Sequence, residues 1–301
     1  MFDKIFGEYL LKKGKLTKEE LDNIYADMMH EFVKLGMIAV REGFMTAEQA
    51  DEVNALQAST DCRFGDLAVE KGYITPAELN SILRIQGNYF YHFLQATINT
   101  GKYTLEQLDE ELQEYQKEEG LSNSEMDSLI SGDVTRVVDV YLPHQDQMYG
   151  RLCSIAVKTF LRLIDSNVYI RRAFKCSHME ADRFACQRTY GMNNTVSGFA
   201  GDGDALLDMA STFAKEEFEQ VDLDALDSVA EFTNCVNGLF TTETYSMGVE
   251  LEMLPPELYD KRVDINAAEF YVVPMISKGK TIYFIIAMDS ALLVNEAEGG
   301  V

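Results

Sequence analysis

A repeat of 29 residues in the N-terminal part of the chain restricts the fold more than any other feature. A glycine returns once per period, at Gly14, Gly43, Gly72 and Gly101. Each period is typical of a short helix, a glycine that ends it, and a second helix. Because one such unit cannot bury its own apolar face, residues 1–118 are predicted to form four stacked helical hairpins.

The start of each second helix is marked by a further motif of the same period. A threonine follows each glycine by three residues, and a Glu or Gln follows each threonine by three more. This spacing is that of a capping box, in which the two side chains satisfy free backbone N–H groups at a helix N-terminus. The pairs are Thr17 with Glu20, Thr46 with Gln49, Thr75 with Glu78, and Thr104 with Gln107.

Two of the periods also carry a set of basic, glycine, leucine and glutamine positions. In the third period these are Arg63, Gly65, Gly72, Leu79, Leu83 and Gln86, and Lys34, Gly36, Gly43 and Gln57 match them loosely in the second. The pattern resembles the N-terminal domains of type II secretion and type IV pilus ATPases, of which the MshE N-terminal type binds cyclic di-GMP. The resemblance implies that Arg63, Gly65 and Gln86 bind a ligand; the alternative is a purely structural repeat.

Residues 119–134 follow as a predicted acidic linker that contains one short helix. From residue 105 to 127 there are nine acidic residues and a single basic one. Ser122 and Glu125 form a capping box, and Leu121 and Met126 are spaced as a hydrophobic staple. A short helix with its own apolar stripe is suited to docking into a partner's groove.

The same segment resembles the N-terminal peptide of the flagellar switch proteins FliM and FliY, which binds a phosphorylated chemotaxis response regulator. The resemblance implies partner binding by Leu121, Ser122, Glu125, Met126, Asp127, Leu129 and Ile130. The alternative is a capped connector helix that packs on its own domain.

Residues 135–298 mix helical and strand patterns. Helices are predicted over 145–163, 204–218 and 223–239, and strands over 183–191, 195–201, 249–254, 269–276 and 281–288. The fold class is therefore α+β: helical repeats, then a domain in which long helices pack on an antiparallel sheet.

The last predicted helix carries a polar stripe. Asp227, Glu231 and Asn234 stand at i, i+4 and i+7 and share one face, while apolar residues occupy the other side. A carboxylate and an amide one turn apart form a candidate polar pair. An ordinary exposed polar stripe is the alternative.

The motif Glu231-x-x-Asn234-x-x-x-Gly238, with Asp227 before it and Pro256 after it, resembles the CheC/CheX/FliY chemotaxis phosphatases. The predicted order of elements over residues 135–295 is similar as well. Helix 145–163 contains no Glu, so the resemblance is to the single-site CheX type, which also implies a homodimer.

This resemblance implies a phosphatase of the aspartyl phosphate on a CheY-like receiver domain, in chemotaxis or two-component signalling. The receiver would hold Mg²⁺ and a lysine at the phosphate, so no cofactor is expected on this chain. Asn234 would orient a water in line with the phosphorus, as a glutamine does in GTP hydrolysis. Glu231 would pair with the receiver's lysine, and Asp227 would contact the partner. The 121–132 peptide would raise the local substrate concentration.

Charge narrows the choice of partners. The chain has 26 basic and 50 acidic residues, a net charge of −24, which disfavours nucleic acids and anionic membranes. No apolar run approaches the roughly 20 residues of a membrane span, so membrane insertion is not expected.

Five cysteines, an odd number, indicate free thiols in a reducing compartment. The chain start also lacks a signal-peptide pattern, so a cytoplasmic location is expected. Cys176, His178 and Cys186 hint at a metal site, but a fourth ligand is not evident and no metal site is predicted.

Two other functions stay open. One is a non-catalytic scaffold that binds a receiver or a flagellar component, although such a scaffold has no need of the Glu231–Asn234 pair. The other is an adaptor that responds to cyclic di-GMP through the N-terminal repeats.

Overall fold

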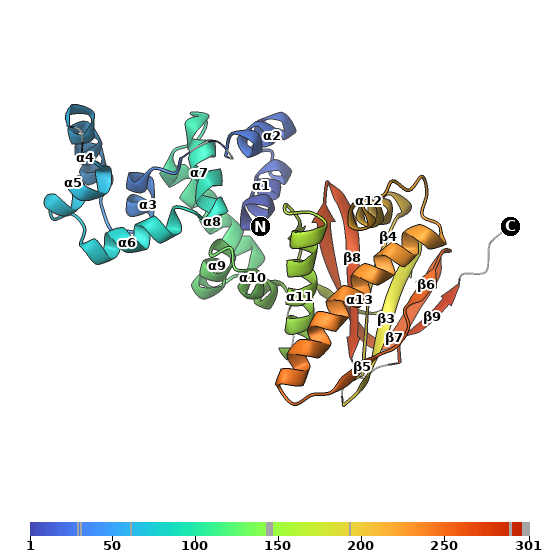
Figure 1. Cartoon of the computed structure of the whole chain (residues 1–301). Coiled ribbons are helices and arrows are strands. Elements are labelled where there is room, and N and C mark those ends of the chain that lie inside the picture. The colour runs from blue at the N-terminus through green and yellow to red at the C-terminus, as the bar shows by residue number, and fades with distance from the viewer. Residues whose placement is uncertain are drawn as a thin grey trace. The chain divides into compact units, whose positions relative to one another are not determined.

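The computed structural model describes residues 1–28, 30, 32–60, 62–142, 147–192, 194–288 and 291–296. The chain divides into two compact units, Met1–Gly132 and Asp133–Val301 (Figure 1). Of the helices in the described residues, none combines the length and the apolar character that a membrane span requires.

Unit 1 is entirely helical in its described residues. Its helices are α1 (Phe2–Lys12), α2 (Lys18–Asp27), α3 (Leu35–Arg41), α4 (Ala47–Ser59), α5 (Phe64–Glu70), α6 (Pro76–Ile85), α7 (Tyr89–Asn99), α8 (Leu105–Glu119) and α9 (Asn123–Ile130). All four predicted threonine capping boxes are formed, with both hydrogen bonds present at α2, α4, α6 and α8. The four glycines of the repeat adopt φ of 68° to 75°, the left-handed conformation that ends a helix.

The four predicted hairpins pack in two pairs rather than in chain order, an arrangement on which the sequence analysis made no prediction. Instead α3 and α4 pack against α5 and α6, while α1 and α2 pack against α7 and α8. The first and last repeats are joined by aromatic rings: Phe2 and Phe6 of α1 contact Phe90 of α7 and Tyr115 of α8, with the rings of Phe2 and Phe90 5.1 Å apart. Repeats distant in sequence therefore share one core.

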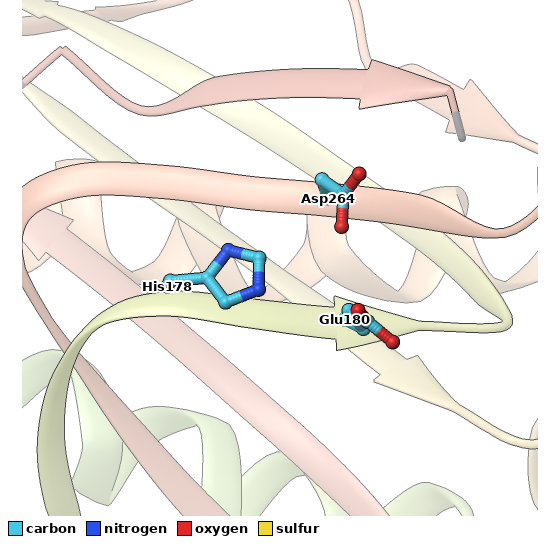
Figure 2. Close-up of side chains that lie close together, drawn as sticks. All are labelled: His178, Glu180 and Asp264. Carbon is cyan, nitrogen blue, oxygen red and sulfur yellow. The ribbon is translucent and has the colours of Figure 1, made fainter. Parts of the chain in front are cut away.

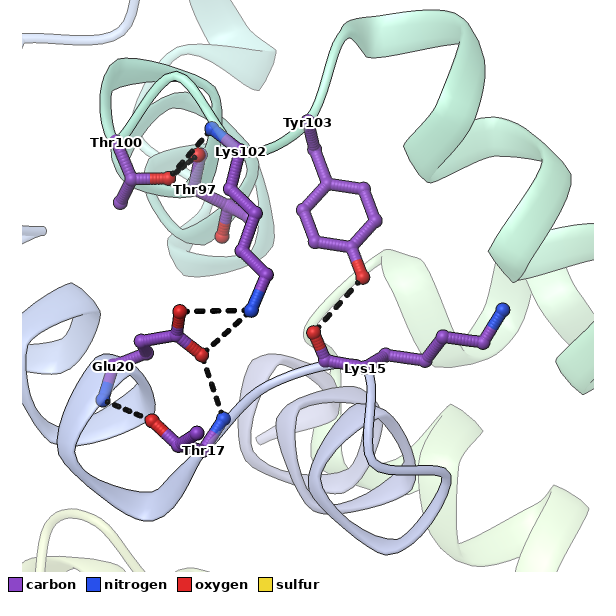
Figure 3. A network of polar contacts seen from close by, with 7 residues as sticks. All are labelled: Lys15, Thr17, Glu20, Thr97, Thr100, Lys102 and Tyr103. Carbon is purple, nitrogen blue, oxygen red and sulfur yellow. Dashed lines mark hydrogen bonds and ion pairs between the residues drawn. The ribbon is translucent and has the colours of Figure 1, made fainter.

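Polar contacts support the same pairing of the first and last repeats (Figure 3). Glu20 accepts the backbone N–H of Thr17 at 2.7 Å in its capping box and also pairs with Lys102, whose Nζ lies 2.7 Å from Glu20 Oε2. The hydroxyl of Tyr103 donates to the carbonyl of Lys15 at 3.1 Å. One capping residue thus also binds the turn of the fourth repeat.

The predicted linker helix belongs to unit 1 in the structure. Helix α9 begins at the Ser122–Glu125 capping box, as predicted, but Leu121, Met126 and Leu129 are buried. Gln116 of α8 donates to the carbonyl of Leu121 at 3.1 Å. A partner-binding helix would leave this apolar stripe free. In the structure, the other helices of unit 1 cover it.

Unit 2 combines four helices with nine strands in its described residues. The helices are α10 (Val134–Tyr141), α11 (Gln147–Leu163), α12 (Gly203–Ala214) and α13 (Leu223–Ser246). The strands are β1 (Tyr169–Ile170), β2 (Phe174–Ala181), β3 (Arg183–Gly191), β4 (Thr195–Gly201), β5 (Leu251–Met253), β6 (Glu257–Tyr259), β7 (Val263–Ser277), β8 (Lys280–Met288) and β9 (Leu293–Glu296). The α+β class predicted for this region is confirmed.

All pairings in the sheet are antiparallel, in the order β1-β7-β8-β4-β3-β5. Strand β7 is long enough to change partners: its second half pairs with β8, and its first half pairs with β2 and β9. Strand β6 pairs with β3.

The sheet has a core on each face. On the helical face, α11, α12 and α13 cover the central strands (Figure 1), and Phe160, Phe199 and Phe232 pack edge to face or tilted against one another. On the other face, alternate residues of the same strands form a second core with β2 and β9, which includes Phe184, Cys186 and Phe270. Alternate residues along β3 therefore face different cores.

The predicted elements of unit 2 differ in extent from those observed. Strands β3 and β4 have the predicted bounds, whereas α13 continues to Ser246 and β7 starts at Val263. Helix α10 and strands β1, β2, β6 and β9 were not predicted. Residues 143–146 and 297–301 lie outside the described residues, so the predicted helix start and domain end fall there.

Candidate functional site

Helix α13 presents the predicted polar stripe to solvent. Its apolar side, with Val229, Phe232 and Val236, is fully buried. On the opposite side Asp227 and Glu231 are exposed and Asn234 is half-buried. Asp227 and Glu231 form no hydrogen bond or ion pair with any residue that the structure describes, so both carboxylates are available to a partner.

The amide of Asn234 is held from beneath by the sheet. Gln187 lies on the helix-facing side of β3, and its Nε2 donates to Asn234 Oδ1 at 2.9 Å. Gln187 in turn accepts from Nδ2 of Asn237 at 3.0 Å, and Ser197 donates to Asn237 Oδ1 at 2.8 Å. These four side chains, Ser197, Asn237, Gln187 and Asn234, form one directional chain of hydrogen bonds, here called the amide relay.

A backbone carbonyl fixes the direction of the amide relay. The Nε2 group of Gln187 also donates to the carbonyl oxygen of Leu254 at 2.9 Å. Because a carbonyl oxygen only accepts, the nitrogen of Gln187 must face it, and its second hydrogen then requires the oxygen of Asn234 rather than its nitrogen. The Nδ2 group of Asn234 has no hydrogen-bond partner among the described residues, so its two N–H donors remain for a ligand.

Burial makes the amide relay rigid. Asn237 is fully buried, Ser197 is fully buried and Gln187 is 2% exposed. Buried polar groups that satisfy one another fix a single arrangement, since losing one bond would leave a desolvated group without a partner. Asn234 thus reaches the surface in one orientation, which is the property required of a group that positions a reactant.

The surface beside Asn234 is apolar. Leu254, whose carbonyl binds Gln187, and Met253 are each more than two-fifths exposed, as is Leu239 further along α13. Further along α13, Thr241 and Tyr245 line a groove of about 680 Å³ with the end of β3 and with β5. Exposed apolar residues around a small polar centre are typical of a protein-binding surface.

Three members of the amide relay were missed by sequence reasoning. Gln187 could have been noticed as a polar residue in the centre of a predicted strand, since such residues are buried and hydrogen-bonded. Asn237 lies one turn after Asn234 on the same helix. No sequence signal indicated that these residues meet, because Gln187 and Asn234 are 47 positions apart.

The predicted ligand residues of the repeats lie within unit 1. A Cβ atom at Gly65 would come 2.6 Å from Leu79 Cδ1, so this glycine allows α5 to approach α6 closely. Gln86 donates to the carbonyl of Val33 at 2.7 Å. Arg63 is exposed at the N-terminus of α5. Gly65 and Gln86 therefore make contacts within unit 1, and among the described residues no hydrogen bond or ion pair joins Arg63 to Gln86.

The two cysteines that were considered with His178 as metal ligands do not lie on the same face as this histidine. Cys186 is inside the second core and Cys176 packs against it, whereas His178 is exposed. A register irregularity between Cys176 and His178 turns the two side chains to opposite faces. The three residues do not form a metal site.

The elements that carry the amide relay and the stripe fall within one recognisable sequence region. Residues 184–275 match the family model of the chemotaxis phosphatase CheX. The CheX match runs from β3 to β7 and includes Gln187, Ser197, Glu231, Asn234 and Asn237. Unit 1 lies outside it.

Solved structures similar to the chain cover about half of its length. A CheC-like protein from Shewanella sp. PV-4 is 16% identical, with a TM-score of 0.44, over 48% of this chain and 99% of that one. CheX from Desulfovibrio desulfuricans is 11% identical, with a TM-score of 0.43, over 48% and 100%. A chain of the CheX–CheY–BeF₃–Mg²⁺ complex from Borrelia burgdorferi is 18% identical, with a TM-score of 0.40, over 47% and 97%. Among curated proteins, none matches the chain.

Proposed function

We propose that unit 2 hydrolyses the aspartyl phosphate of a response-regulator receiver domain. The observation that carries this proposal is the pair of Glu231 and Asn234 on the exposed face of α13, with the amide of Asn234 oriented by Gln187 from within the sheet. The CheX family match over the same residues supports it.

Hydrolysis of an aspartyl phosphate requires few catalytic groups from this chain. An aspartyl phosphate is an activated acyl phosphate, and the receiver would supply Mg²⁺ and a lysine to its phosphoryl oxygens. Asn234 has one lone pair of Oδ1 left after the bond from Gln187, together with two N–H donors. The lone pair accepts a hydrogen bond from the attacking water, and an N–H donates a hydrogen bond to a phosphoryl oxygen. This places the water in line with the phosphorus.

Glu231 contributes to binding between this chain and the receiver. Its unpaired carboxylate lies one helical turn from Asn234, and it pairs with the receiver's lysine. This contact fixes the position of α13 relative to the phosphate. Asp227, a further turn away, adds attraction at the edge of the contact.

The segment at 121–132 is not needed for this proposal. Its apolar residues Leu121, Met126 and Leu129 are buried in unit 1, so they would reach a receiver only after α9 left its unit. Its role in partner binding stays a prediction, as does nucleotide binding by the repeats.

The test is phosphate release from a panel of phosphorylated receivers by the full chain. We expect Asn234→Ala to lower turnover on the order of 10²- to 10³-fold while binding persists, and Glu231→Ala to weaken both. Asn54→Ala, which removes an exposed amide from α4, is the matched control and should be unaffected. Binding of receivers with no phosphate release by the unmodified chain would instead assign a scaffold role.

A further inference from the structure

Outside the amide relay, one cluster of metal-ligating side chains lies on the ribbon of β2 and β7. Glu180 stands directly opposite Asp264, and His178 directly opposite Asn266. All four side chains point to the same face, because they alternate with Met179 and Ile265, which face the second core. Figure 2 shows the imidazole of His178 beside Asp264 and Glu180, with one ring nitrogen toward Glu180.

The distances fit a single small cation. One donor atom from each of His178, Glu180 and Asp264 lies within 4.8 Å of the others. In a tetrahedral zinc site with bonds of about 2.1 Å, the donors are roughly 3.4 Å apart. His178 and Glu180 are exposed and Asp264 is half-buried, so rotation of the two exposed side chains would close the remaining gap.

A neighbouring amide prepares His178 to be a ligand. Its Nδ1 lies 3.0 Å from Asn266 Oδ1. An amide oxygen only accepts, so Nδ1 carries the proton and the lone pair of the neutral ring is on Nε2. A metal-bound histidine is typically oriented in this way by an acceptor on its other nitrogen.

The charges of the cluster are only partly compensated. Glu180 pairs with Arg262, whereas Asp264 forms no hydrogen bond or ion pair with any described residue. Two carboxylates directly opposite each other on paired strands repel. A divalent cation between them removes this repulsion, and Arg262, whose side chain is 61% exposed, returns to water at little cost.

We propose that His178, Glu180 and Asp264 bind one Zn²⁺ ion, which links β2 to the first half of β7. A nitrogen and two carboxylate oxygens suit zinc, and three protein ligands leave a fourth position for water or a further ligand. Asn266 orients His178 from behind. Arg262 competes with the ion for Glu180.

The test is calorimetric titration of the metal-free full chain with ZnCl₂. The Cys62→Ser/Cys235→Ser variant serves as background, because these exposed thiols would bind zinc elsewhere. We expect one equivalent of zinc, bound at least about tenfold more weakly by His178→Ala and by the isosteric Asp264→Asn. Asn266→Ala should weaken binding by about tenfold, as is typical of residues that orient a ligand.

Two further variants make the result specific. His30→Ala removes another histidine and should leave the affinity unchanged, whereas Arg262→Gln should raise it by freeing Glu180. Far-ultraviolet circular dichroism checks that every variant folds. The absence of zinc binding, or equal binding by the unmodified background, His178→Ala and Asp264→Asn, would overturn the proposal.

Discussion

Gln187 on β3 donates a hydrogen bond of 2.9 Å to the amide oxygen of Asn234 on α13. Through this bond the sheet determines which atoms of Asn234 face a partner. The orientation of the proposed water-positioning group is therefore a property of the sheet as well as of the helix that carries it.

Replacing Gln187 by methionine should separate orientation from binding. The apolar side chain fills a similar volume but cannot donate to Asn234 Oδ1, so we expect kcat to fall on the order of 10- to 100-fold with little change in KM. The free energy of unfolding should fall by about 1–3 kcal/mol, because the carbonyl of Leu254 and Nδ2 of Asn237 lose their partner.

The control for that prediction is a double-mutant cycle. If Gln187 acts through Asn234, Gln187→Met should have no further effect on kcat in the Asn234→Ala background. Fully additive losses would show that Gln187 acts on activity by another route, such as general destabilisation.

Gly238→Ala should stabilise unit 2 and impair its activity. The new Cβ would meet only Met253 Cε, at 4.0 Å, so packing does not require glycine here. Alanine in a helix is favoured over glycine by roughly 0.5–1 kcal/mol, which corresponds to an increase in Tm of about 1–4 °C for a unit of this size. The methyl group lies one turn after Asn234, so under the proposed function we expect it to hinder sterically the docking of a receiver on α13.

Calorimetry and phosphate release measure the two effects of Gly238→Ala separately. A higher Tm together with a lower kcat/KM is the expected result. Unchanged kcat/KM in the stabilised variant would place residue 238 outside the contact with the receiver.

Four of the five thiols should divide into two classes by reactivity. Burial raises the pKa of Cys153 and of Cys186 to about 12 each, while Cys62 and Cys235 are exposed. At pH 8 a thiol reagent should therefore modify Cys62 and Cys235 rapidly and the two buried thiols only on unfolding. Rapid reaction of Cys153 or Cys186 in the native chain would contradict the packing described here.

The same pKa shifts predict a loss of stability in alkali. Unfolded thiols ionise near pH 8.5–9, below the raised pKa of the folded ones, so the folded state binds more protons above that pH. The contribution is complete below about pH 8.5 and is lost as the pH rises toward 12. Urea unfolding at pH 8 and pH 10 should show the fall, and Cys153→Ala with Cys186→Ala should reduce its slope.

Local interactions explain what could be predicted from the sequence. The capping box of Thr75 and Glu78 spans three residues, and the left-handed turn at Gly72 depends on that residue alone, so both are visible without knowledge of the fold. The stripe of Glu231 and Asn234 follows from the period of one helix.

The features that could not be predicted depend on distant partners. Strand β2 is largely exposed and lacks the apolar pattern of a strand; it forms because β7 offers an edge about 90 residues later. The apolar stripe of α9 has the same appearance in sequence whether it faces a partner or its own unit. His178 was noted, but its neighbours Glu180 and Asp264 emerge only from the register of β2 against β7.

The first repeat pairs with the fourth, and the second with the third, and this arrangement has a consequence for biosynthesis. Helix α1 leaves the ribosome before α7 and α8, yet the rings that cover its Phe2 and Phe6 belong to those later helices. The middle repeats can associate as soon as they emerge, while the first must wait with its aromatic side chains uncovered until translation has passed Glu119. In a nascent chain halted before that point, the second and third repeats would be packed together. The first repeat would still expose its aromatic side chains and would be prone to aggregate.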